Sequence, residues 1–152
     1  MDLVFKAIHV LAACVWVGGT VALVFIAVPA ARRLQGDERA SMLRALGRGW
    51  RPLGWGAMAL LGASGIELAV SDDAFGGAGR DFDALLGAKL GLVSLLVVGA
   101  FLHDFVLGPT LARQIREGRP QTARRPLVFV GWANFALTVT IPVLGVALAH
   151  LG

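Results

Sequence analysis

The distribution of apolar and polar positions divides the chain into four long apolar stretches separated by charged or glycine-rich connections. The apolar stretches cover residues 3–29, 52–70, 84–107 and 127–151. A helix rises about 1.5 Å per residue, so roughly 20 apolar residues cross the hydrocarbon core of a bilayer. Each stretch is therefore predicted to be a membrane-spanning helix, and residues 1–152 are predicted to form a single domain.

Composition supports an integral membrane protein. The chain is 57% hydrophobic and 16% charged, whereas a soluble domain has about half apolar and about a quarter charged residues. Its 14 Lys and Arg exceed its 10 Asp and Glu, but the basic residues gather in two connections. This charge pattern indicates membrane topology rather than nucleic-acid binding. The single cysteine, Cys14, excludes a disulfide or a cysteine-based zinc cluster within one chain.

The first apolar stretch is predicted to be a retained span rather than a signal peptide. A signal peptide has an apolar core of roughly 7–15 residues that follows a basic segment. Here the apolar stretch is longer, and the basic pair Arg32 and Arg33 comes after it.

The arginine distribution predicts which connections face the cytoplasm. The connection at residues 30–51 holds six arginines and that at residues 110–126 holds five, whereas residues 71–83 contain Arg80 alone with four aspartates. Arginine-rich connections stay in the cytoplasm. Both termini and residues 71–83 are therefore expected outside the inner membrane of a bacterial cell. Short connections between successive spans predict an all-α, up-down-up-down four-helix bundle in the lipid bilayer.

Much of the first connection is expected to be helical and to lie at the membrane surface. Asp37 is a suitable N-cap, and Met42, Leu43 and Leu46 would form a short apolar face. Pro52 is expected in the first turn of the second span, where its missing N–H group costs little.

Four ionisable residues are predicted at the outer level of the bundle, one from each span: His9, Glu67, Lys89 and His150. Such groups are costly inside a bilayer and often mark sites. We expect His9 to be a ligand for a metal ion or haem, with Lys89 and Glu67 as charge partners and His150 as a further ligand. The alternative is a structural Glu67–Lys89 pair, with Lys89 extended toward the interface and His150 solvated.

Two further candidates lie deeper in the spans. Trp16 follows His9 by seven residues and so lies on the same helix face. It is expected to form a wall for a flat ligand, with plain packing as the alternative. His103 with Asp104 lies near the cytoplasmic end of the third span. His103 is either a further metal ligand or part of a polar boundary.

Three stretches resemble the CopD-type copper-resistance membrane domain: FKAIHVLAACVWVGG, LLGAKLGLVSLL and GWANFALTVTIPVLGVALA. That resemblance implies copper handling or transport at the inner membrane. Cu(I) favours sulfur ligands, and within the predicted spans only Cys14 and Met58 provide sulfur. A histidine site for Cu(II) or haem stays open.

The placement of His9 and Lys89 also resembles HemJ-type protoporphyrinogen oxidases, which implies haem b and an oxidoreductase activity. The sequence departs from that family after the first span, where it reads AVPAARR. A third alternative is a non-catalytic scaffold, which would form homo-oligomers through glycine-rich faces of the second and third spans.

Overall fold

The computed structural model describes residues 2–71 and 80–151, and over these ranges the chain is helical with no strand. Four helices are long and apolar enough to cross a membrane: Leu3–Arg32, Gly36–Val70, Phe82–Arg116 and Arg124–Ala149. The prediction of an all-α chain with four potential spans is confirmed. These helices are compatible with a multi-pass membrane protein in a lipid bilayer.

The chain divides into two compact units, Met1–Ala78 and Gly79–Gly152. Each unit contains two of the four long helices, and each is described by itself. The single domain and the up-down-up-down order of all four spans concern the assembly of the two units, so both stay predictions.

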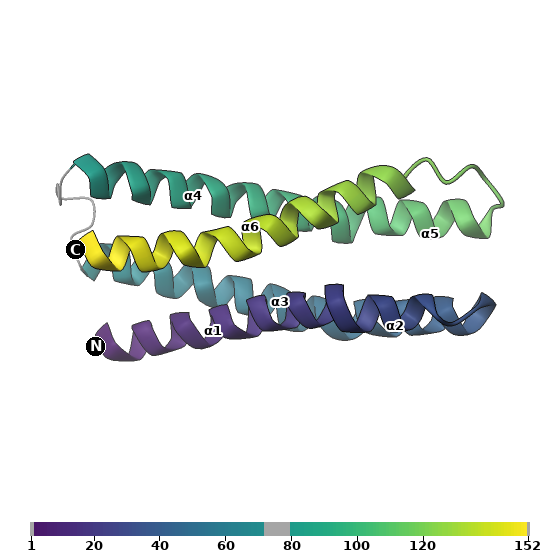
Figure 1. Cartoon of the computed structure of the whole chain (residues 1–152), viewed down its shortest axis with the longest axis horizontal. Helices are drawn as coiled ribbons and strands as arrows, with labels where there is room; N and C mark the ends of the chain where they lie inside the picture. Colours follow the sequence, from purple (N-terminus) through teal and green to yellow (C-terminus); the bar gives the residue numbers. More distant parts are fainter. Residues whose placement is uncertain (1, 72–79, 152) are drawn as a thin grey trace. The chain divides into compact units, whose positions relative to one another are not determined.

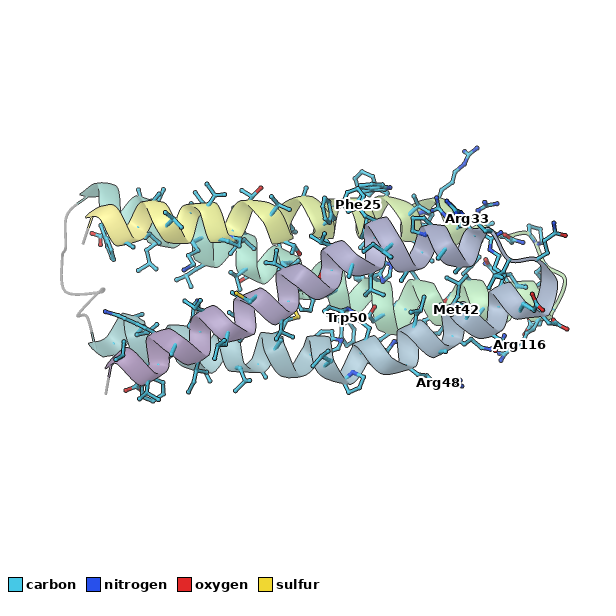
Figure 2. The ribbon with its side chains drawn as sticks, turned by 60° about the horizontal axis from the view of Figure 1, so that its bottom comes forward. Phe25, Arg33, Met42, Arg48, Trp50 and Arg116 are labelled. Atoms are coloured by element: carbon cyan, nitrogen blue, oxygen red, sulfur yellow. The ribbon has the colours of Figure 1, made fainter. Side chains whose placement is uncertain are left out.

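Unit 1 is a helical hairpin (Figure 1). Its first arm is one continuous run of helix, and its second arm is a single long helix. The elements are α1 (Asp2–Ala22), the π-helical segment η1 (Leu23–Ala27), α2 (Val28–Arg32) and α3 (Gly36–Ser71). The chain reverses between α2 and α3 at Gly36, whose φ of 52° lies in the left-handed region that favours glycine. Arg33 and Arg48 lie toward this turn, whereas Trp50 lies farther along α3 (Figure 2).

The predicted helical character of the first connection is confirmed, but the predicted start of the second helix at Pro52 is wrong. Helix α3 is continuous from Gly36 to Ser71, with Pro52 in its interior. A proline removes one backbone hydrogen bond and disfavours a helix interior, but tertiary contacts can override such a local preference. Here the other arm extends beyond α1 as α2, and α2 contacts α3. The arginine-rich residues 37–51 therefore continue the second span.

Unit 2 is a second helical hairpin (Figure 1). Its elements are α4 (Arg80–Phe101), the π-helical segment η2 (Leu102–Leu107), α5 (Gly108–Arg116) and α6 (Arg124–Leu151). The predicted end of the third span at residue 107 is wrong, because Pro109 lies in the first turn of α5 and the helix continues to Arg116. A first-turn proline lacks only an N–H group that would have no helical partner.

The prediction of a loop at residues 71–83 is wrong at both ends of this stretch. Ser71 belongs to α3 and residues 80–83 belong to α4, so both ends of this stretch are helical. Residues 72–79 lie outside the described residues.

The side chain of Gln114 fixes the connection between α5 and α6. Its Nε2 donates a hydrogen bond to Thr122 Oγ1 at 2.8 Å, and its Oε1 accepts one from the backbone N–H of Ala123 at 3.2 Å. Ala123 is buried. These contacts hold the start of α6 against the end of α5.

Unit 2 repeats the plan of unit 1. In each hairpin a long helix leads into a π-helical segment, then a short helix with proline in its first turn, and finally a long return helix. When the first arms are aligned with an offset of 80 positions, Gly19 matches Gly99, Phe25 matches Phe105 and Pro29 matches Pro109. At the same offset, the counterpart of His9 is Lys89. The chain therefore contains two matching hairpins in tandem.

The interior of unit 1 is narrow and contains several small side chains. Alanines 12, 31 and 57 are buried in unit 1, while most large apolar side chains face outward. Leu3 is 81% exposed and Ile26 is 68% exposed. In a bilayer such surfaces are satisfied by lipid, and small residues let two helices approach closely.

Candidate functional site

His9 is held by a serine on the return helix of its own hairpin. Its Nδ1 lies 2.9 Å from the Oγ of Ser64. Ser64 is only 2% exposed, and its hydroxyl also bonds the backbone carbonyl of Leu60 one turn earlier. The contact therefore ties α1 to α3 through two polar side chains inside an otherwise apolar hairpin.

The Ser64 contacts assign the protonation of the imidazole. A serine hydroxyl has one hydrogen to donate, and here that hydrogen points to the Leu60 carbonyl. This arrangement favours the tautomer in which His9 Nδ1–H donates to Ser64 Oγ. In the neutral ring the lone pair is then on Nε2. A histidine ligand commonly has this arrangement, in which one nitrogen donates to a fixed partner and the other binds the metal.

Gly65 provides the space in which the His9 ring lies. A Cβ atom built on Gly65 would lie 3.2 Å from Cε1 and 3.7 Å from Nδ1 of His9. Even a methyl group would press against the ring. Ser64 and Gly65 therefore act together, since one residue holds Nδ1 and the other leaves room for the ring.

Trp16 packs against Trp50 of α3. The ring centroids are 5.8 Å apart with an interplanar angle of 37°, and Trp16 is 9% exposed. Gly54 receives both rings, because a Cβ on Gly54 would lie 3.1–3.2 Å from them. The packing alternative for Trp16 is observed. A role for Trp16 as the wall of a ligand site stays a prediction.

Lys89 occupies the position in unit 2 that His9 occupies in unit 1. Its Nζ lies 3.5 Å from where a Cβ on Gly145 of α6 would be. Each hairpin thus places a nitrogen-bearing side chain of its first arm against a glycine of its return helix. Glu67 is on α3 of unit 1, so its expected pairing with Lys89 concerns the assembly of the two units and stays a prediction.

His103 and Asp104 lie within the π-helical segment η2. Nδ1 of His103 is 3.0 Å from Oδ1 of Asp104, and the His103 side chain is 40% exposed. Nε2 of His103 lies 3.5 Å from where a Cβ on Gly131 of α6 would be. Single-turn π-helical segments often occur at functional sites. A metal-binding role for His103 stays a prediction.

The other proposed ligands, His103 and His150, belong to unit 2. His150 is on α6, but its side chain lies outside the described residues. Among the described side chains, no three from His, Cys, Asp and Glu come together as a metal site. Cys14 is exposed and not disulfide-bonded.

Ser64 and Gly65 are the functional candidates that the sequence interpretation missed. The signal for them is present in the adjacent serine and glycine of the second span. However, to pair them with His9 one must know how α3 is oriented about its own axis. Neither apolar periodicity nor composition gives that orientation, because both helices have apolar residues on all of their faces.

Comparisons with known proteins leave the family unassigned. A scan against protein-family models finds no match, and searches of curated proteins and of solved structures find no similar chain. The resemblances to CopD-type and HemJ-type proteins therefore stay predictions, and the functional argument depends on the geometry of the hairpins.

Replacing Ser64 with alanine is expected to destabilise unit 1 by about 1 kcal/mol, because the His9 Nδ1–H group loses its acceptor. Thermal unfolding in detergent measures the effect. Ser94→Ala is the matched control, since Ser94 is exposed and its hydroxyl donates to the Leu90 carbonyl of its own helix. Equal unfolding temperatures for the two variants would contradict a stabilising His9–Ser64 contact.

Proposed function

We propose that this chain is an integral membrane haem b protein in which His9 would hold the haem iron. The observation that carries the proposal is the 2.9 Å contact between His9 Nδ1 and Ser64 Oγ. This contact orients the ring before any ligand arrives. Preorganised ligands of this kind lose less freedom when they bind a metal.

A single oriented imidazole suits haem better than an isolated copper ion. The porphyrin supplies four nitrogens, so the protein needs to provide only one or two axial ligands. A protein copper site instead takes most of its ligands from side chains. Haem b would supply one-electron transfer, with a potential tuned by the axial ligand and its hydrogen bonds.

The residues around this site would orient the haem by charge. Haem carries two propionates, and Lys89, at the matching position of unit 2, is the proposed cation for one of them. Glu67 is the proposed counter-charge of Lys89 when no propionate is present. Both assignments depend on the two hairpins packing together with His9 and Lys89 at one level.

The proposed location is the outer half of the bacterial inner membrane, with both termini outside. This orientation depends on the arginines around the two hairpin turns, which favour the cytoplasm. His9 and Lys89 lie at the opposite ends of their hairpins from those arginines. The site would therefore exchange electrons or ligands on the outer side.

The absorption spectrum of protein purified from membranes in mild detergent tests the proposal. A Soret band with stoichiometric haem b is the expected result. Colourless protein with stoichiometric copper by elemental analysis would overturn it in favour of copper handling, as the CopD-like resemblance implies. Protein that contains neither cofactor, even after incubation with haemin, would overturn the proposal in favour of a non-catalytic membrane scaffold.

A further inference from the structure

The start of α6 forms an open pocket on the surface of unit 2. Arg124, Arg125, Val128, Phe129 and Trp132 line this pocket, which has a volume of about 550 Å³. Its residues are spaced by three and four positions, so they form one stripe along the first two turns of the helix. The stripe has two guanidinium groups at its beginning and two aromatic rings at its end.

This stripe faces away from the other arm of its hairpin. The residues of α6 that meet α4 and η2 include Gly131, opposite His103, and Asn134, whose side chain occupies the space beside Gly99. At 100° per residue, Asn134 lies about 150° and Gly131 about 90° from the middle of the stripe around the axis of α6. Val128, Phe129 and Trp132 are all exposed, so the pocket lies outside the contacts that α6 makes with α4 and η2.

The apolar side of the pocket is unusually exposed. Phe129 is 74% exposed, Trp132 is 55% exposed and Val128 is 47% exposed. The Trp132 ring meets the ring of Phe135 edge-on, with centroids 5.9 Å apart. Aromatic residues near the end of a span typically lie at the level of the lipid headgroups.

The charged side of the pocket has one sign. Both ionisable residues of its lining are arginines, and each guanidinium can bind a phosphate with two parallel hydrogen bonds. The arginines directly follow Ala123, which Gln114 holds through its backbone N–H. The pair is thus fixed at one position on the surface, unlike arginines in an untethered loop.

We propose that this pocket binds an anionic phospholipid. The phosphate of the headgroup lies between Arg124 and Arg125, and one acyl chain follows Val128, Phe129 and Trp132 down the span. Charge selects the headgroup, since two arginines complement an anionic lipid but not a zwitterionic one. The apolar wall selects a lipid over a free phosphate, because a soluble anion would leave the two aromatic rings unused.

Native mass spectrometry of the full chain from nanodiscs of mixed phosphatidylcholine and phosphatidylglycerol tests this proposal. The expected result is selective retention of phosphatidylglycerol. The double variant Arg124→Gln/Arg125→Gln should lower that retention about tenfold or more, since each basic residue near an anionic surface contributes about 1 kcal/mol. Arg113→Gln/Arg116→Gln removes equal charge from α5 outside the pocket and should change retention less than twofold.

Three results would overturn the proposal. One is equal loss in the two double variants, which would indicate a diffuse charge effect. Another is unchanged retention in Arg124→Gln/Arg125→Gln. The third is displacement of the lipid by inorganic phosphate alone, which would indicate a free-anion site. Thermal unfolding shows whether each variant is folded. The variant Phe129→Ser keeps both arginines and should also weaken retention of phosphatidylglycerol, because it removes part of the apolar wall. The test does not depend on haem.

Discussion

Replacing His9 with alanine is expected to abolish the Soret band of the purified protein, with at least a tenfold loss of bound haem. The imidazole is the proposed link between the iron and the chain, and a methyl group offers no nitrogen. Loss of a ligand or of its supporting shell typically costs 10–100-fold in metal affinity. The measurement is the haem content per protein, taken with the absorption spectrum, after purification of both forms from the same amount of membrane.

Two controls separate ligation from folding. Val10→Ala changes the neighbouring residue, which is 59% exposed, and should keep full haem content. Adding haemin together with imidazole to purified His9→Ala should restore a Soret band, because a soluble ligand can replace the missing side chain. Retention of the wild-type spectrum by His9→Ala would contradict ligation by this residue.

Replacing Gly19 with alanine is expected to destabilise unit 1 by about 1–3 kcal/mol, the usual range for overpacking. A Cβ on Gly19 would overlap the ring of Trp50, which fills the space beside this glycine. The ring cannot move away easily, because it also packs against Trp16 and Gly54. Thermal unfolding in detergent, followed by tryptophan fluorescence, measures the loss.

Gly18 is the matched control for this prediction. It precedes Gly19 in α1, yet a Cβ built on it has no atom within 4 Å. Gly18→Ala should be neutral or stabilising, since alanine favours a helix by up to about 1 kcal/mol over glycine. If both variants unfold at the same temperature, the Trp50–Gly19 contact does not hold the hairpin together.

The sequence predicted the number and type of the long helices because length and apolarity decide whether a helix can span a bilayer. It failed at the helix ends near Pro52 and Pro109. At both positions proline was interpreted as a boundary, whereas the helix continues on its other side. The reason is physical, since proline removes one hydrogen bond but does not prevent the next turn from forming.

The candidate site was predicted only in part. His9 stood out because an imidazole is rare inside an apolar span. Its partners did not, since Ser64 and Gly65 are common residue types in such helices. The 80-residue spacing that relates Phe25 to Phe105 and Pro29 to Pro109 is readable in the sequence. It was missed because so few identical residues mark the repeat.

The tandem hairpins have a consequence for how this chain arose and inserts. A hairpin of two spans begins and ends on the same side of the bilayer, so a duplicated hairpin enters the membrane in the same direction as the original. No reversal of charge bias is needed, and both turns keep their arginines.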